Sequence, residues 1–265
     1  MKIVLKVGSS TLTYASGRLN LRFIENLVRV ICDLKGMGHD VILVTSGAQV
    51  AGMTKLKLKK KPKNTPKRQA LAAVGQGELM SIYDRFFDDY GCNMGQILMN
   101  KEVLQIPSLK ANLTNTFKAL LRYGCVPVVN ENDSVEVDEI KFGDNDTLSA
   151  VVASCVKADR LIILTDIDAL YTANPAHDPD AKPIRVVEKI TDDVRALAGD
   201  TISNKGTGGM ITKIRAAEIA TGSGTQMHIV CGHDPRIIFD VIENKEVGTK
   251  FTVPHRHRTA EGQKV

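Results

Sequence analysis

Short polar side chains crowd residues 141–146, which read KFGDND. Asn145 and Asp146 stand directly before an apolar run, and Lys141 lies just upstream of them. An amide, a carboxylate and an ammonium group this close together fit a fragment of a calcium loop, a helix cap or part of an active site. The spaced oxygen ligands of a calcium loop, and the glutamate that closes it at the twelfth position, are absent, so a cap or a catalytic segment is the better interpretation.

Two further segments combine a lysine with glycines and hydroxyl residues. Lys6 and Gly8 belong to KVGSST at residues 6–11, and Lys213 ends the segment GTGGMITK at residues 206–213. Backbone N–H groups in such turns bind phosphate, and a lysine in the first turn of a helix opposes the helix dipole unless an anion lies beside it. Neither segment matches the Walker A or the GxGxxG pattern. They indicate a phosphate site of another design, with a plain strand-to-turn connection left open for the first.

Polar residues also follow three other apolar runs. Burial of Asn130 and Asp133, in NEND, would cost desolvation free energy unless a polar ligand with an ammonium or hydroxyl group bound to them. Ser46, in TSGA, is a natural helix cap. Thr165 and Asp166 end another run, where they would contact a nucleotide or cap a turn. Several loops therefore contribute to one candidate site.

The elements that must position these residues follow from the hydrophobic pattern. Strands are predicted for six short apolar runs, at residues 2–7, 41–44, 96–99, 126–129, 161–164 and 227–230, and helices are predicted for residues 21–38, 68–91, 112–124, 146–158 and 212–224. Nearly continuous apolar strands that alternate with helices predict an α/β fold, a doubly wound, largely parallel sheet sandwiched by helices. Ligands of such sheets bind beyond the carboxyl ends of the strands, where the polar segments lie.

Composition excludes several classes of protein. No apolar run reaches the length of about 20 residues that a membrane span needs, so we expect no membrane association. Five scattered cysteines without a CxxC pair indicate reduced thiols and a cytoplasmic location. The net charge of +5 comes from residues 53–68, which hold eight basic and no acidic residues. We interpret this segment as a solvated loop and expect no nucleic acid partner, because it lacks the aromatics and glycines of an RNA-binding patch.

The ordered set of motifs is similar to the amino acid kinase family. It comprises KVGSS, TSGA, NEND, GDND, TDIDALYTANP and GTGGMITK, and the segments RQALAAVGQGELM and VPVVNENDSVEVDEIKFGDND resemble most the members that phosphorylate the side-chain carboxylate of L-glutamate in the first step of proline biosynthesis. The resemblance implies an amino acid kinase, or carbamate kinase-like, fold over residues 1–252. Its N-terminal half, about 1–150, would bind glutamate, and its C-terminal half, about 151–252, would bind ATP. A tail would follow at 253–265, without the C-terminal PUA domain that many members carry.

The same resemblance implies a role for each motif residue. Lys6 and Lys213 would stabilise the transferring phosphoryl group, Asp146 would hold both lysines in position, and Lys141 would assist near the phosphoryl group or be an ordinary exposed lysine. The glutamate-binding set is Ser46, Gly47, Asn130, Asp133 and Asn145. The ATP-binding set is Lys6, Gly8, Thr165, Asp166, Thr207, Gly208, Gly209, Met210, Ile211, Thr212 and Lys213.

Cofactors and partners are implied in the same way. The enzyme would be a phosphotransferase that uses ATP with Mg²⁺, and the metal would sit on the ATP phosphates with no direct side-chain ligand. Proline would inhibit by feedback, and the chain would form a homo-oligomer, a dimer or a tetramer. Two alternatives remain: another amino acid kinase, such as one acting on N-acetylglutamate, and a non-catalytic module that binds a metabolite or RNA.

Overall fold

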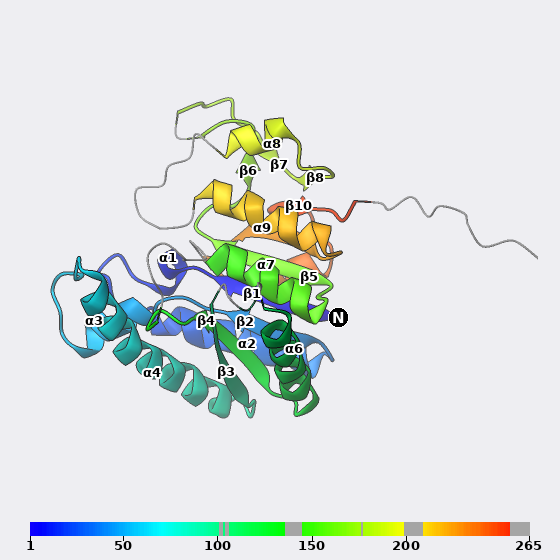
Figure 1. The fold of residues 1–265 in the computed structure, drawn as a ribbon. Helices are drawn as coiled ribbons and strands as arrows, with labels where there is room; N and C mark the ends of the chain where they lie inside the picture. The colour runs from blue at the N-terminus through cyan, green and yellow to red at the C-terminus, as the bar shows by residue number, and fades with distance from the viewer. Residues whose placement is uncertain (101–102, 104–105, 136–144, 176, 199–208, 255–265) are drawn as a thin grey trace, which may run out of the picture.

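A central eight-stranded sheet organises the computed structural model, which describes residues 1–100, 103, 106–135, 145–175, 177–198 and 209–254 (Figure 1). The strands of this sheet are β1 (Lys2–Val7), β2 (Asp40–Val44), β3 (Met94–Met99), β4 (Val126–Glu131), β5 (Arg160–Thr165), β8 (Val186–Val187), β9 (Gln226–Cys231) and β10 (Thr249–Phe251). Their order is β3-β4-β2-β1-β5-β9-β10-β8, and every pairing is parallel except that of β10 with β9. The predicted largely parallel α/β sheet is confirmed.

All six predicted strands are present, each within two residues of the predicted bounds. Strand β1 lies at the centre of the sheet, and its residues from Ile3 to Val7 are buried. Its register pairs Lys6 with Val44 of β2 on one side and with Ile163 of β5 on the other. The carboxyl ends of these three strands therefore meet at one edge, as parallel pairing requires.

Helices cover both faces of the sheet (Figure 1). One face packs against α6 (Pro107–Arg122), α7 (Asn145–Val156) and α9 (Met210–Gly222), and the other packs against α2 (Leu21–Gly36), α4 (Thr65–Asp89) and α10 (Ile237–Ile242). Because strand side chains alternate between faces, Val4 joins the first core while Ile3 and Leu5 join the second. This two-sided burial explains why the strands read as continuous apolar runs.

Helix α3 (Ala48–Lys55) packs against α4 with almost no space between their backbones. A Cβ atom added at Gly75 would lie 1.7 Å from the carbonyl oxygen of Ala48, and one added at Gly52 would lie 2.1 Å from that of Leu71. Glycine is required at both positions because no side chain fits there. The contact fixes the long helix α4 beside the loop that follows β2.

The second half of the chain carries short elements beyond the main sheet. They are β6 (Leu170–Tyr171) and β7 (Pro183–Ile184), which pair antiparallel, and α8 (Asp192–Leu197); in the first half α1 (Ser9–Leu12) follows β1 directly. Within the described residues from 167 to 198, secondary structure is confined to these short elements and β8. None of the described helices is long and apolar enough to cross a membrane.

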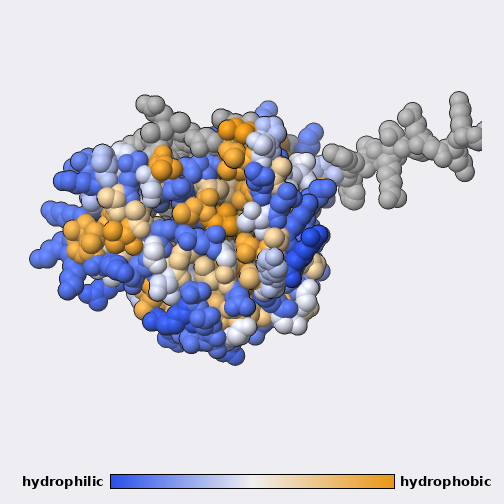
Figure 2. Space-filling model, turned by 60° about the horizontal axis from the view of Figure 1, so that its bottom comes forward, coloured by the Kyte–Doolittle hydropathy of each residue, from blue (hydrophilic) through white to orange (hydrophobic). Residues whose placement is uncertain are grey.

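The basic segment is only partly a loop, which corrects the expectation from its composition. Residues 53–55 complete α3 and residues 65–68 begin α4, so the connection is confined to residues 56–64. Within it, Leu56 and Leu58 are 49% and 41% exposed. Figure 2 shows apolar (orange) and hydrophilic (blue) side chains beside each other at this end of the molecule, on the left. The lysines are spaced by leucines and prolines, which the charge count alone does not reveal.

Candidate active site

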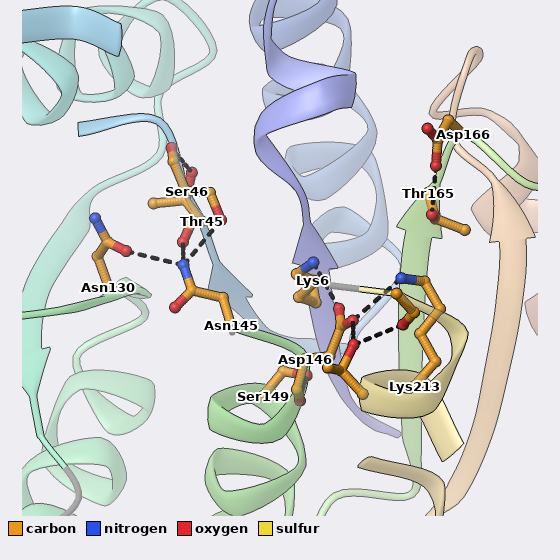
Figure 3. Close-up of polar contacts among 12 residues, drawn as sticks. Lys6, Thr45, Ser46, Asn130, Asn145, Asp146, Ser149, Thr165, Asp166 and Lys213 are labelled. Atoms are coloured by element: carbon orange, nitrogen blue, oxygen red, sulfur yellow. Dashed lines mark hydrogen bonds and ion pairs between the residues drawn. The ribbon is translucent and has the colours of Figure 1, made fainter. Parts of the chain in front are cut away.

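Asp146 brings together two lysines from distant parts of the chain (Figure 3). Lys6 lies near the carboxyl end of β1, and its Nζ is 2.6 Å from Asp146 Oδ1. Lys213 lies in the first turn of α9, and its Nζ is 3.2 Å from Asp146 Oδ2. The Thr212 hydroxyl donates to the same Oδ2 at 2.9 Å. The expected pairing of Asp146 with both lysines is confirmed.

The three charges are almost completely buried. Asp146 is fully buried, and Lys6 and Lys213 are 7% and 4% exposed. Burial would raise the pKa of Asp146, but the ammonium groups of Lys6 and Lys213 outweigh it and hold the pKa of this carboxyl at about 2. Two ammonium groups therefore face one permanent carboxylate. The surplus positive charge favours an anion beside the lysines, in the way that an enzyme stabilises charge developing on a phosphoryl group.

Glycine-led turns flank this cluster on both sides. Gly8 is the N-cap of α1, and a Cβ added there would lie 3.3 Å from Lys6 Nζ, so the Lys6 ammonium lies beside the Gly8 backbone. Gly209 is the N-cap of α9, and no side chain caps either helix. Next in α9, Met210 is buried and Ile211 is 56% exposed. The uncapped N–H groups near both lysines could donate to phosphate oxygens.

Asn145 connects a second polar group to the cluster (Figure 3). Its Nδ2 donates to the Thr45 carbonyl at 2.7 Å, to Ser46 Oγ at 2.8 Å and to Asn130 Oδ1 at 3.1 Å. The prediction that Ser46 caps a helix is wrong. The N-cap of α3 is Gly47, with a left-handed φ of 98°, and the Ser46 hydroxyl accepts from Asn145 instead because this turn directs it toward β4 and α7.

Sequence reasoning missed two residues of this polar group, and both lie on α4. Gln76 Oε1 accepts from Asn130 Nδ2 at 2.8 Å, and the hydroxyl of Tyr83 lies 2.8 Å from Thr45 Oγ1. The signal was present in the segment VGQG, where a glutamine beside a glycine interrupts the apolar side of a helix. The segment entered the family resemblance, but no role was assigned to Gln76, because nothing in the sequence places α4 beside the end of β4.

The remaining predicted residues lie around these two groups. Thr165, at the end of β5, donates to Asp166 Oδ1 at 3.0 Å, and Figure 3 shows this pair on the side of Lys213 that faces away from Asn145. Asp133 follows β4 and is half-buried. Three predicted site residues lie outside the described part of the chain: Lys141, Thr207 and Gly208. Residues 143–144, directly before α7, lie outside it as well.

Among the described residues, no group of three or more His, Cys, Asp or Glu side chains is placed to hold a metal ion. A cavity of about 720 Å³ lies between α2 and the segment after β9, lined in part by Arg22, Arg29 and Arg236. No residue predicted for the site lines that cavity, so it is separate from the lysine cluster.

Comparison with known proteins gives consistent matches. The model of the amino acid kinase family matches residues 1–231. Glutamate 5-kinase of Clostridium tetani is 54% identical over 249 residues, 94% of this chain and 93% of the relative. Glutamate 5-kinase of Thermoanaerobacter sp. is 50% identical over 251 residues, 95% of this chain and 68% of the relative.

Solved structures with the same fold are much less similar in sequence. Carbamate kinase from Giardia lamblia bound to AMP-PNP superposes with a TM-score of 0.67 at 16% identity, over 95% of this chain and 98% of that one. Isopentenyl phosphate kinase of T. acidophilum superposes with a TM-score of 0.65 at 18% identity, over 95% and 100%. At these identities the structures establish the fold alone.

Proposed function

The chain belongs to the amino acid kinase family, and on this premise we propose that it transfers the γ-phosphoryl group of ATP to the side-chain carboxylate of L-glutamate. The products are ADP and L-glutamyl 5-phosphate, and the reaction is the first step of proline biosynthesis. The observation that carries this proposal is the identity of 47–54% with glutamate 5-kinases over 94% of the chain.

Catalysis of this reaction requires charge stabilisation more than proton transfer. The side-chain carboxylate of glutamate has a pKa of about 4.3, so it is ionised at neutral pH and attacks phosphorus without a general base. The difficulty is to bring this anion against the ATP phosphates. Lys6 and Lys213 neutralise the charge on the transferring phosphoryl group from two sides, and Asp146 keeps both ammonium groups in position.

Glutamate binds at the polar group around Asn145. The three acceptors around Nδ2 leave Asn145 Oδ1 as the acceptor that faces the substrate. Together with Asp133, which follows β4, it suits the substrate α-ammonium group. Ser46 and Gly47 precede the N-terminus of α3, and Asn130 supports Asn145. The N-terminal half of the domain, about 1–150, therefore holds glutamate.

ATP binds on the other side of Asp146, in the half at about 151–252. Thr165 and Asp166 contact the nucleotide, and the run from Thr207 to Lys213, together with Gly8, contacts the phosphates. Mg²⁺ would be bound through the ATP phosphate oxygens. The carboxylate of Asp146 is occupied by the two lysines, so it fits a positioning role better than that of a metal ligand.

Three further properties belong to the same proposal: inhibition by proline, assembly into a homo-oligomer and a cytoplasmic location. Five free cysteines agree with a reducing compartment. Proline resembles glutamate in its α-carboxylate and α-nitrogen, so it would compete at the glutamate end of the site. Assays in millimolar proline, and light scattering of the purified chain, test the first two properties.

The substrate assignment is tested by ADP release with L-glutamate, N-acetyl-L-glutamate and L-aspartate at equal concentrations. We expect turnover with glutamate at least about tenfold above the other two, because a site that pairs the half-buried carboxylate of Asp133 and an amide oxygen with the α-ammonium rejects an acetylated nitrogen. Preferred turnover of N-acetylglutamate would assign the chain to another activity of the family.

A further inference from the structure

The side-chain amide of Gln76 has an orientation that its partners determine. Asn130 Oδ1 accepts a hydrogen bond from the backbone N–H of Glu131 at 2.9 Å, so the other terminal atom of the Asn130 amide is the donor Nδ2. That Nδ2 donates to Gln76 at 2.8 Å, and the atom of Gln76 that receives it must therefore be the oxygen Oε1. Asn145 is fixed independently, because its Nδ2 donates to a backbone carbonyl. The other terminal atom of the Gln76 amide is therefore the donor Nε2.

This donor is buried without a hydrogen-bond partner among the described residues. Leaving an amide N–H unpaired away from water carries the desolvation penalty of the group, which natural sites avoid unless a ligand completes the bond. Apolar residues would fill the same space at no such cost. The amide therefore indicates a bound acceptor close to Asn130.

The location of Gln76 identifies the end of the substrate that it meets. Its partner Asn130 lies on the side of Asn145 away from Lys6 and Lys213 (Figure 3). The reacting carboxylate must lie at the two lysines, so the group near Asn130 is the opposite end of the amino acid. That end carries the α-ammonium group and the α-carboxylate, and only the carboxylate can accept from an N–H donor.

We propose that Gln76 Nε2 donates a hydrogen bond to the α-carboxylate of the amino acid substrate, and that this residue determines the requirement for a free α-carboxylate. The inference rests on the glutamate kinase activity proposed above. Gly75 makes the contact possible, because only a residue without Cβ lets α4 approach Ala48 this closely and bring the adjacent Gln76 to β4.

The test compares kcat/KM for L-glutamate with that for glutamate α-amide, which replaces the α-carboxylate by a carboxamide and keeps the side-chain carboxylate. Gln76→Glu retains an oxygen for Asn130 but replaces the donor by a carboxylate, and Gln76→Met removes the donor at similar volume. Gln226→Glu, at the amino end of β9 on the opposite edge of the sheet, is the matched control. All four proteins are assayed at pH 8, with thermal melting as the measure of folding.

Gln76→Glu should lower kcat/KM for glutamate by roughly 10- to 100-fold, the range for a hydrogen bond to a charged group. The α-amide should lose much less, so the ratio between the two substrates shifts by that factor, while KM for ATP stays within about twofold. Gln76→Met should also lose the preference for glutamate over the α-amide. If Gln76→Glu does not fold, Gln76→Met therefore still tests the proposal.

Equal losses of kcat/KM on both substrates, or an unchanged preference for glutamate in a folded variant, would overturn this role. Gln76 would then only hold Asn130 in position. Wild-type protein that turns over neither compound would instead contradict the proposed function. The control should behave like the wild type on both substrates.

Discussion

The carboxylate of Asp146 lies 2.6 Å from the ammonium nitrogen of Lys6, although one residue lies in the first turn of helix α7 and the other lies in the central strand β1. The second oxygen of the same carboxylate contacts Lys213 of α9. Asp146 thus joins the two segments that the sequence indicates as phosphate-binding, and it holds the ammonium groups of Lys6 and Lys213 near each other.

Replacing Lys213 by methionine should lower kcat by roughly 10²- to 10³-fold, the effect of removing one donor to charge that develops in the transition state. The fold should persist, because methionine keeps most of the apolar stem and Asp146 retains Lys6. Steady-state ADP release measures the change. Lys118→Met, at an exposed position on α6, should leave kcat unaltered. Near-normal turnover in Lys213→Met would remove this residue from the catalytic set.

Asp146 should make stability sensitive to acid. Its pKa is about 2 in the folded chain and 3.8 as the ordinary value, so the unfolded state binds the proton more readily. The group therefore stabilises the fold above pH 4, and this contribution of about 2 kcal/mol is lost as the pH falls from about 4 toward 2. Urea unfolding at pH 5 and pH 3 measures it.

The control for that titration is the variant Asp146→Asn, which has no carboxyl group to protonate. It should be less stable at pH 7 by roughly 3 kcal/mol, because two buried ammonium groups lose their counter-charge. Its free energy of unfolding should also fall less between pH 5 and pH 3 than that of the wild type. The same acid dependence in both proteins would show that other carboxyl groups cause it.

The contact between α3 and α4 should not tolerate a methyl group at Gly75. An alanine Cβ would lie 1.7 Å from the Ala48 carbonyl oxygen, so the helices must separate, at a cost of roughly 3 kcal/mol or more. Gly77→Ala, two residues along the same helix, meets nothing within 4 Å and should stabilise by roughly 0.5–1 kcal/mol. Urea unfolding of both variants measures the difference, and similar stabilities would contradict this packing.

His228 should contribute a second pH dependence, at less acidic values. Burial in β9, with Arg160 and Lys250 nearby, lowers its pKa from 6.5 to about 3. The unfolded state takes up the proton first, so stability is lost as the pH falls below 6.5, at up to about 1.4 kcal/mol per pH unit. His228→Phe should flatten the change in unfolding free energy between pH 7 and pH 5, whereas His233→Asn, at an exposed position, should not. An equal slope in His228→Phe and wild type would exclude His228 as the cause.

Most of the fold followed from the sequence, because strand and helix patterns are local. The runs at 2–7 and 161–164 are nearly continuous in apolar residues, which predicts burial on both faces, and the structure places them side by side as β1 and β5. Helix α3 is missing from the predicted helices and α4 begins three residues before its predicted start, because basic and hydroxyl residues continue both helices into a segment that looked like a loop.

The site was predictable where motifs carried it and not where tertiary contacts made it. Lys213 opposes the helix dipole and Lys6 precedes a turn of glycine and hydroxyl residues, so both stood out in the sequence, and Asp146 was identified through its motif GDND. Gln76 has no unusual local feature. Its contact with Asn130 depends on the close approach of α4 at Gly75, and the sequence does not indicate a contact between residues that are 54 positions apart. The cap role predicted for Ser46 was wrong for a similar reason, because its contact with Asn145 is also a long-range one.

The phosphoryl acceptor can be identified directly, because the side-chain carboxylate of free L-glutamate would become an acyl phosphate. An acyl phosphate reacts with hydroxylamine, so incubation of the wild-type chain with ATP, Mg²⁺, glutamate and hydroxylamine should yield the side-chain hydroxamate of glutamate in an amount equal to the ADP released. ADP without the hydroxamate, or hydroxamate formed only from N-acetylglutamate, would contradict the account.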